Sequence, residues 1–514
     1  MTRREFYLYN TASRSKEKFV PLHDQVGMYC CGPTVYDYAH AGNMRTYIWE
    51  DALDRTIRAL GFKLRHVMNI TDVGHLTSDE DTGEDKMEKG ARREGKTASE
   101  IAQFYTDAFM KDLKALNCRT PDVVCRATDH VPEMIDMIQK LKQKGFTYKT
   151  SDGIYFDTSK FPKYVEFARL DPEQLQAGSR IDMGEKRSNT DFALWKFSPK
   201  DTKRQMEWDS PWGVGFPGWH IECSAMSLKY LAQPIDIHCG GQEHIRVHHS
   251  NEIAQAEAAT GKQFARYWLH IGLLTINGEK MSKSLGNIIN VRDLLKTWDA
   301  EVIRMFFAQA HYRSPPDYSE KALSDVQKGL DRLYRLKQRL ESLVKNTSHK
   351  KQIVEALTPD EQQYETIIKE FEYGFVEAMD DDFNTPKAFA ALFEFVNASN
   401  SFFEHHTKIN TNLCQQALDV YLKIGSVLTL FQPSTKPEKK ADTHLISLLQ
   451  ILLKQVGGTS GSSYQDELLD QLLVLRNKAR ASKDWTTADT IRKELEKLGF
   501  EIQDTLKGST WRRK

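Results

Sequence analysis

Residues 26–70 constrain the fold of this chain more than any other stretch. Val26–Cys30 is a short apolar run, and a Gly-Pro pair soon ends it as a turn would. Residues 43–60 then repeat apolar side chains at helical spacing, and a second apolar run covers Val67–Ile70. Strand, helix and strand at this spacing predict a parallel βαβ unit and therefore an α/β fold.

The end of the first strand and the start of the helix are where such a unit binds ligands. Free N–H groups at a helix start suit a phosphate, and Gly42 would let a bulky ligand approach the backbone. His40 and Asn43 flank that glycine, and Cys31 ends the first strand. Taken singly, a histidine at a turn is more often structural, and a buried cysteine is more often a small apolar residue.

A second half of the same kind is expected further along the chain. The pattern predicts a helix over 220–231, a strand over 234–239, a turn at Gly240-Gly241 and a helix over 245–260. Residues 121–220 between the halves are mixed and rich in turns. From residue 291 to about 431 the pattern is overwhelmingly helical.

One spacing in this second half is typical of metal ligands. His248 and Glu252 are four residues apart in a predicted helix, so their side chains meet on one face. His249 at the same offset faces Ile253, which cannot ligate, so the spacing favours His248 over its neighbour. His244 and His248 form an alternative pair.

Two cysteines can complete such a site. If the two halves of the fold face each other, Cys31 and Cys223 can join His248 and Glu252, and this donor set suits Zn²⁺. The alternative is that these residues are unconnected. Seven cysteines in a chain whose start lacks the apolar core of a signal peptide favour reduced thiols and a cytoplasmic protein.

A lysine-containing loop follows at Gly278–Gly286. Lys280 and Lys283 lie between its glycines, with serine hydroxyls as further donors. Two ammonium groups on such a loop can neutralise charge on a polyphosphate. The alternative is a solvated lysine loop.

Charge and hydropathy limit the partners. Lys and Arg number 71 and balance 71 Asp and Glu, so a nucleic-acid surface must be local. No apolar run reaches the roughly 20 residues that a membrane helix needs.

The end of the chain is locally basic. It places Lys478, Arg480 and Lys483 around Trp485, a pattern that fits stacking on a single-stranded base. The alternative is a two-helix cap with Trp485 in its core.

Together these motifs resemble those of cysteinyl-tRNA synthetases, which are class I aminoacyl-tRNA synthetases. His40-Ala-Gly-Asn43 and Lys280-Met-Ser-Lys-Ser284 match the two signatures of the class. The further matching stretches, of which the first three carry the cysteine-specific pattern, are Met28–Asp37, Pro217–Met226, His248–Gln255, His311–Ser314, Met379–Thr385 and Trp511–Lys514.

The resemblance implies a role for each matching position. The zinc ligands, for one Zn²⁺ per chain, would be Cys31, Cys223, His248 and Glu252. The cysteine substrate would contact Gly32, Thr71 and Trp219. The catalytic residues would be His40, Asn43, Lys280 and Lys283. The ATP contacts would be His40, Gly42, Asn43, Gly241, Glu243 and Lys283. The tRNA anticodon would contact Arg480, Trp485, Asp489 and Asp504.

The resemblance also implies a fold: a Rossmann-like α/β catalytic domain with an insertion, then α-helical domains and a small C-terminal anticodon-binding module. The expected regions are 1–120 and 219–275 for the two catalytic halves, 121–218 for the connective insertion, 276–330 for the lysine loop and stem-contact region, 331–431 for a helical bundle, 432–464 for a linker and 465–514 for the anticodon module. Three features depart from the family pattern: Asn43 replaces a histidine, Glu243 replaces an aspartate, and the acidic stretch Val73–Glu84 is longer than usual.

The implied activity is activation of L-cysteine by ATP, with Mg²⁺, to cysteinyl-adenylate, followed by transfer to the 3′-terminal adenosine of tRNA(Cys). A monomer without membrane contact is expected. Two other hypotheses stay open: a ligase that gives cysteine to a small amine, and a non-catalytic RNA-binding paralogue. The basic terminal module argues against the first, and the intact His40, Lys280 and Lys283 argue against the second.

Overall fold

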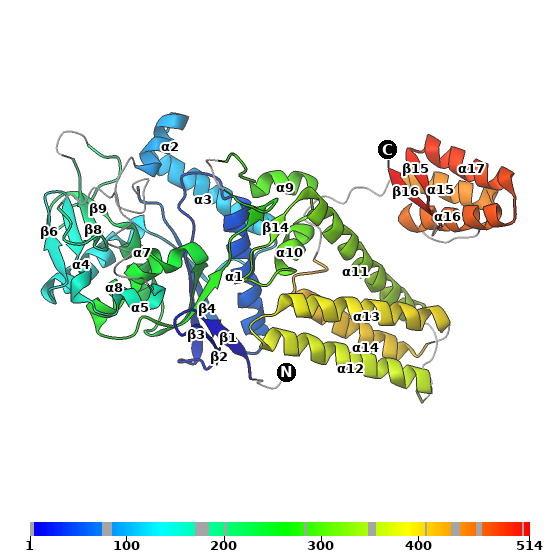
Figure 1. Cartoon of the computed structure of the whole chain (residues 1–514), viewed down its shortest axis with the longest axis horizontal. Helices are drawn as coiled ribbons and strands as arrows, with labels where there is room; N and C mark the ends of the chain where they lie inside the picture. The colour runs from blue at the N-terminus through cyan, green and yellow to red at the C-terminus, as the bar shows by residue number, and fades with distance from the viewer. Residues whose placement is uncertain are drawn as a thin grey trace. The chain divides into compact units, whose positions relative to one another are not determined.

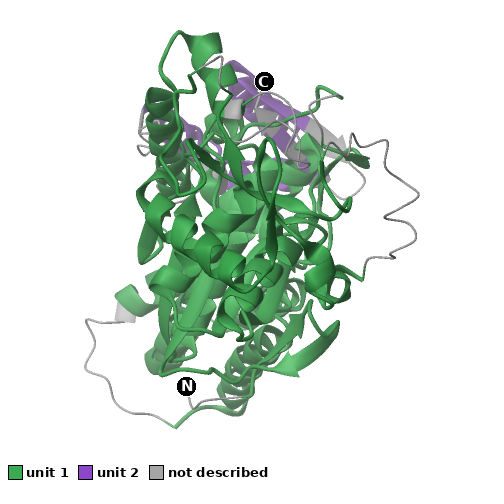
Figure 2. Cartoon of the chain, turned by 90° about the vertical axis from the view of Figure 1, so that its left-hand side faces the viewer, with its two compact units in different colours: residues 1–432 green, residues 433–514 purple. Residues whose placement is uncertain are grey.

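The computed structural model describes residues 5–74, 85–169, 185–199, 203–281, 285–347, 356–406, 409–432, 443–458, 465–505 and 508–513. Lys283 and residues 75–84 of the acidic stretch therefore lie outside the described residues. For Asp504 only the backbone is described. The chain divides into two compact units, residues 1–432 and 433–514 (Figure 2).

A five-stranded parallel sheet lies at the centre of the first unit (Figure 1). In spatial order its strands are β11 (Ala265–Ile271), β10 (Ile235–Gly241), β3 (Gln25–Cys30), β4 (Lys63–Ile70) and β5 (Val123–Arg126). From β3 the chain proceeds to β4 on one side, and later returns as β10 on the other. The carboxyl ends of β3 and β10 thus meet where strand order reverses, the place at which open α/β sheets bind ligands.

Helix α1 (Ala41–Ala59) joins β3 to β4 and confirms the predicted βαβ unit. It starts with a reciprocal cap, because Nδ1 of His40 accepts from the Asn43 N–H at 3.1 Å and Oδ1 of Asn43 accepts from the His40 N–H at 3.3 Å. Met44, Ile48 and other apolar residues of one face are buried. The helix ends before Gly61, whose φ of +86° favours glycine.

The second half of the sheet differs from the sequence-based prediction in two places. Gly240 and Gly241 do not form a turn but are the last residues of β10, because Gly241 pairs with Ile271 of β11. Residues 242–245 form a 3₁₀ turn, so the helix expected from Ile245 begins later, as α8 (His248–Thr260). The helix expected over 220–231 is confirmed as α7 (Trp219–Tyr230).

The insertion has its own antiparallel sheet, in the order β6-β7-β8-β9. Its elements are α4 (Val131–Gln143), β6 (Thr147–Lys149), β7 (Gly153–Phe156), α5 (Tyr164–Ala168), β8 (Phe192–Phe197) and β9 (Gly215–Pro217). Strand β5 falls inside the range expected for the insertion, but it pairs with β4 in the central sheet. Two helices, α2 (Lys86–Glu94) and α3 (Ala98–Ala115), precede it.

The remaining parts of the first unit are a hairpin, a small sheet and a helical region. The N-terminal hairpin has two strands, β1 (Tyr7–Asn10) and β2 (Ser15–Lys18). The small sheet contains β12 (Thr275–Ile276), β13 (Glu279–Lys280) and β14 (Asp317–Tyr318). The helices are α9 (Val291–Thr297), α10 (Ala300–Ala308), α11 (Glu320–Thr347), α12 (Pro359–Asp380), α13 (Thr385–His405) and α14 (Thr411–Val427), and Figure 1 shows the last four lying along one another.

The second unit has its own apolar core. Its elements are α15 (Thr443–Gln455), α16 (Gln465–Ala481), α17 (Trp485–Lys497), β15 (Phe500–Thr505) and β16 (Gly508–Arg513). Leu449 of α15, Leu472 of α16 and Ile491 of α17 are fully buried together. This unit therefore includes α15, which lies before the boundary at 465 expected from the sequence.

Across the parts of the chain that are described, no helix combines the length and the apolar character needed to cross a bilayer.

Candidate active site

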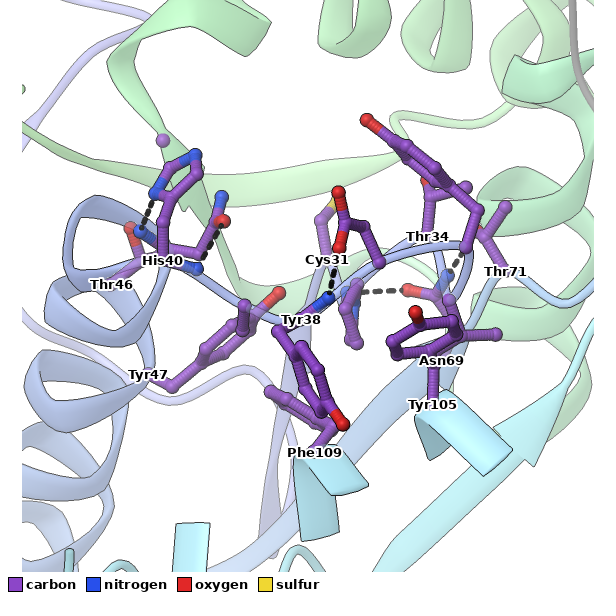
Figure 3. Close-up of a pocket in the computed structure, with 18 of the residues that line it drawn as sticks. Cys31, Thr34, Tyr38, His40, Thr46, Tyr47, Asn69, Thr71, Tyr105 and Phe109 are labelled. Atoms are coloured by element: carbon purple, nitrogen blue, oxygen red, sulfur yellow. Dashed lines mark hydrogen bonds between the residues drawn. The ribbon is translucent and has the colours of Figure 1, made fainter. Parts of the chain in front are cut away.

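A pocket of about 340 Å³ opens at the carboxyl ends of β3 and β10. It brings together predicted residues from both halves of the fold, and Figure 3 shows Cys31 between His40 and Thr71. The predicted residues that line it are Cys31, Gly32, His40, Asn43, Thr71, Trp219, Cys223, Gly241, Glu243 and His248. Tyr38, Tyr47, Tyr105 and Phe109 add an aromatic wall, seen in Figure 3.

The start of α1 forms one end of this pocket. Because Nδ1 of His40 accepts from the Asn43 N–H, a neutral His40 carries its proton on Nε2 and can donate it to a ligand. The Oδ1 of Asn43 is used by the cap, which leaves its Nδ2 as a donor. The side chain of Met281 covers Gly42: a Cβ there would lie 2.8 Å from the Met281 methyl.

The opposite end is built on Gly32 and Thr71. The Gly32 N–H donates to Oδ1 of Asn69 at 2.8 Å, and a Cβ on Gly32 would overlap the Asn69 carbonyl at 1.6 Å. Only glycine fits there. The Thr71 hydroxyl donates to Oε2 of Glu222 at 2.9 Å and accepts from Nδ2 of Asn69 at 3.1 Å. Asn69 and Glu222 were not among the residues predicted from the sequence, although Asn69 lies near the end of β4 and Glu222 directly precedes Cys223.

The four predicted metal ligands converge. One donor atom from each of Cys31, Cys223, His248 and Glu252 lies within 4.8 Å of the other three, and all four residues are buried. Nε2 of His248 is 2.9 Å from Oε1 of Glu252, and Sγ of Cys31 is 3.7 Å from the same oxygen. The i, i+4 spacing thus predicted the contact between His248 and Glu252 correctly.

A second donor group shares two of these residues. His238 and His249 lie within the same limit of Cys31 and Glu252. Nε2 of His249 is 3.4 Å from Sγ of Cys31, so excluding His249 because it faces Ile253 overlooked its i, i+3 relation to Glu252. His238 comes from β10, and only the tertiary structure brings it here. Neither donor group found among the described residues contains His244.

The pocket distinguishes between the two groups. Cys31, Cys223 and His248 line the pocket, whereas His238 and His249 are not among its lining residues. A metal held by the first group would therefore face the pocket, as a site with an open coordination position must. His238 and His249 lie behind that group and contact its ligands.

Charges within the first group compensate one another. Burial lowers the pKa of His248, but the negative charges of Glu252 and Cys223 outweigh it and raise that pKa to about 10. Burial acts to raise the pKa of Glu252, yet His238 and His248 bring it far below its usual value. Burial also opposes ionisation of Cys223, but its contacts with Cys31 and His248 lower its pKa. The proton on His248 balances these anionic groups, and a metal cation binding to the group would displace that proton.

Gly241, Glu243 and Lys280 surround the third side of the pocket. The Glu243 carboxylate lies against Gly241, where a Cβ would be 2.5 Å from its oxygens. Desolvation raises the pKa of Glu243, and the charge of Lys280, which is exposed on β13, is close enough to oppose that rise. Lys280 is thus beside the pocket rather than in its lining, and Lys283 lies outside the described residues.

The residues predicted to contact the anticodon all belong to the second unit. Trp485 is 58% exposed at the start of α17, so the alternative that placed it in a core is wrong. Lys478, Arg480, Lys483 and Asp489 are exposed as well. An exposed indole among exposed cations is the arrangement that a base-stacking surface needs.

Comparisons with known proteins decide the family. The domain described as "tRNA synthetases class I (C) catalytic domain" matches residues 18–328, and a "Cysteinyl-tRNA ligase anticodon binding domain" matches residues 466–512. A "DALR domain" matches residues 374–432. The chain belongs to the cysteine–tRNA ligase family.

Relatives in this family match along almost their whole length. A cysteine–tRNA ligase of Burkholderia lata is 44% identical over 504 residues, covering 98% of this chain and 95% of its own. One from Thermococcus gammatolerans is 41% identical over 508 residues, covering 98% of both chains. The resemblance found from the motifs is confirmed, and so is the class I fold.

Solved structures of other class I synthetases share the fold at low identity. Mycobacterium tuberculosis methionyl-tRNA synthetase bound by methionyl-adenylate has a TM-score of 0.59 at 16% identity, over 79% of this chain and 90% of that one. A putative arginyl-tRNA synthetase from Campylobacter jejuni has a TM-score of 0.53 at 13% identity, over 80% of this chain and 93% of that one.

Proposed function

We propose that this cysteine–tRNA ligase family member activates L-cysteine with ATP in the pocket between β3 and β10 and transfers it to tRNA(Cys). The observation that carries the proposal is the convergence of Cys31, Cys223, His248 and Glu252, the first three of which line the pocket. The sequence brings these four residues from three separate segments. A buried group of two thiols, an imidazole and a carboxylate fits Zn²⁺.

Zinc in the first donor group would account for the choice of substrate. Cysteine and serine differ by one atom, and shape alone separates such pairs by roughly 10–200-fold. Bound zinc supplies a soft partner that deprotonates a thiol and prefers sulfur to a hydroxyl oxygen. The residues of this chain would hold it facing the pocket, and His238 would orient Glu252.

The remaining pocket residues would position the two reactants. The Thr71 hydroxyl and the Trp219 ring would contact the amino acid, whose carboxylate attacks the α-phosphorus of ATP and displaces pyrophosphate. Nε2 of His40, Nδ2 of Asn43 and the N–H groups at the start of α1 would donate to phosphate oxygens. Lys280, joined by Lys283, would neutralise charge on the leaving pyrophosphate.

No protein nucleophile is needed for either step. Adenylate formation is positioning and electrostatic stabilisation, and the ribose hydroxyl of the terminal tRNA adenosine is the nucleophile in the transfer. Gly241 and Glu243 would hold the adenosine of ATP. Arg480, Trp485, Asp489 and Asp504 would contact the anticodon. The accompanying Mg²⁺, the monomeric state and the cytoplasmic location stay predictions.

The decisive experiment is ATP-dependent attachment of labelled cysteine to tRNA, with serine as the control and zinc measured in the same preparation. We expect a charged cysteine tRNA, one zinc per chain and no serine product. Cysteine-dependent exchange between ATP and pyrophosphate without tRNA charging would instead support the small-amine ligase. Folded, zinc-loaded protein with neither activity would support the non-catalytic paralogue. The family membership favours neither alternative.

A further inference from the structure

The segment His311–Ser314, between α10 and β14, lies between two buried charged side chains from distant parts of the chain. One is Arg45, near the start of α1 and two residues after Asn43. The other is Asp382, in the turn between α12 and α13. Both residues are 0% exposed.

Arg45 ties this segment to α1 and to the residues that follow β11. Its Nη2 donates to the carbonyls of Tyr312 at 3.0 Å and Ser314 at 2.6 Å, and its Nη1 donates to the carbonyl of Leu273 at 3.2 Å. The Gly272 N–H donates to the Tyr312 carbonyl at 2.8 Å as well. The carbonyl groups of the segment therefore hold the Arg45 side chain in place. Through Arg45 the segment is attached to α1, the helix that begins at the pocket.

Asp382 holds the other side of the same segment. Its Oδ1 accepts from the Tyr312 hydroxyl at 2.7 Å and from the Tyr9 N–H at 2.8 Å. Its Oδ2 accepts from Nη2 of Arg313 at 2.8 Å and from Nε at 3.0 Å. Asp382 and Phe383 have φ values of +60° and +50°, which non-glycine residues seldom adopt unless the surroundings enforce it. The turn is thus shaped to present this carboxylate.

The segment continues directly into the sheet that carries Lys280. Strand β14 pairs with β12, and β12 pairs with β13, in which Lys280 lies. Oδ1 of Asp317 in β14 accepts from the Gly278 N–H at 2.7 Å and from the Thr275 hydroxyl at 2.8 Å. The chain from Ser314 into β14, together with these hydrogen bonds, thus joins His311–Ser314 to the hairpin of the signature lysine.

We propose that Asp382 is a positioning residue for adenylate formation. By holding His311–Ser314 it fixes both the start of α1 and the Lys280 hairpin, so the α12–α13 turn sets the phosphate end of the pocket. The cysteine end, at Thr71 and Trp219, is built from other elements. This inference rests on the function proposed above.

The test compares two variants in cysteine-dependent ATP–pyrophosphate exchange, which needs no tRNA. Asp382→Asn keeps the size of the side chain but turns an amide toward Arg313. We expect a kcat roughly ten- to a hundredfold lower, because small misplacements of reacting groups have effects of this size, and a raised KM for ATP. The KM for cysteine should stay within about twofold of wild type, since the group that binds it is not displaced.

The matched control is Glu377→Gln, which removes an exposed carboxylate of α12, whose ion pair at 3.2 Å is with Lys387 of α13. It should match wild type in all three constants. Arg313→Lys keeps the charge beside Asp382 and serves as the milder variant if Asp382→Asn folds poorly. Arg313→Lys should lower kcat and raise the KM for ATP, each by less than Asp382→Asn does.

A second measurement does not depend on activity. Hydrogen exchange of the backbone amides over residues 272–281 should be faster in Asp382→Asn than in Glu377→Gln. The inference would be overturned if Asp382→Asn lowered thermal stability but left kcat, the KM for ATP and the hydrogen exchange of residues 272–281 unchanged. Equal rises of both KM values would overturn it too. A wild-type protein that shows no cysteine-dependent ATP–pyrophosphate exchange would refute the proposed function. The hydrogen-exchange measurement alone would then decide whether Asp382 holds the hairpin.

Discussion

The Oε2 atom of Glu252 lies 2.8 Å from Nε2 of His238, and both side chains are fully buried. The other carboxylate oxygen is 2.9 Å from Nε2 of His248, at the pocket wall. One oxygen is thus oriented by an imidazole behind the pocket, and the other is presented to the metal-binding group. Ligating carboxylates are commonly held by such a partner, which fixes the direction of the free lone pairs.

Replacing Cys223 by serine should remove zinc and cysteine activation together. A hydroxyl is a poorer zinc ligand than a thiolate, so we expect bound zinc and cysteine-dependent ATP–pyrophosphate exchange each to fall by roughly a hundredfold or more. Metal analysis and the exchange assay on the same sample measure both. Cys118→Ser is the control, because Cys118 contacts Arg304 at 3.1 Å and belongs to neither donor group. Full exchange activity in zinc-free Cys223→Ser would contradict the role given to zinc.

Thr71→Val should weaken cysteine binding while leaving ATP binding nearly unchanged. The substitution keeps the shape but removes the hydroxyl that donates to Glu222 at 2.9 Å. We propose that the same hydroxyl contacts the charged amino group of cysteine. Losing a hydrogen bond to a charged group costs about 1.5–3 kcal/mol, so the KM for cysteine should rise roughly ten- to a hundredfold. Thr71→Ser, which retains the hydroxyl, should restore most of the affinity. A KM for ATP that rose equally would show that Thr71 acts on the pocket as a whole.

Trp485→Ala should affect tRNA and nothing else. Its indole is 58% exposed, so truncation removes little packing from the second unit. Stacking of one base contributes about 1–3 kcal/mol, and the KM for tRNA in aminoacylation should rise about tenfold or more. Exchange between ATP and pyrophosphate should stay at the wild-type rate. Val474→Ala, at another exposed apolar position of the same unit, is the control and should leave tRNA charging unchanged.

Glu50→Gln should stabilise the protein at high pH. Burial raises the pKa of Glu50 well above its usual value, and contact with Cys30 offsets this only in part. A carboxyl group whose pKa is higher in the folded state than in the unfolded state stabilises the folded protein when it is protonated. That contribution is fully present below the unfolded pKa of about 4.3 and is lost as the pH rises through the folded pKa. A glutamine at this position does not ionise, so the stability of the variant does not fall in this way as the pH rises.

The measurement for Glu50→Gln is the apparent melting temperature at pH 5 and pH 8. We expect the variant to exceed wild type by about 2–4 °C at pH 8, and by less at pH 5. Glu377→Gln, an exposed substitution, should show no such trend. A difference independent of pH would mean that the substitution acts through packing rather than through the ionisation of Glu50.

The sequence by itself determined the βαβ unit, because helical periodicity over 43–60 between two apolar runs admits few other folds. It also predicted the four donor residues that converge at the pocket and several of the residues that line it. The i, i+4 relation of His248 and Glu252 is local, and the remaining ligands followed from the resemblance. The exposure of Trp485 was left open, because helical periodicity does not distinguish an indole in a core from one on a surface.

Only the tertiary structure decided which distant groups meet. His238 reaches Glu252 because β10 lies beside β3, and Glu222 reaches Thr71 because α7 packs at the end of β4. The link from Asp382 through Tyr312 to Arg45 joins segments hundreds of residues apart. Such contacts leave no periodic signal, since each partner is an ordinary polar residue in its own segment. Their geometry arises when the sheet and the helices pack together.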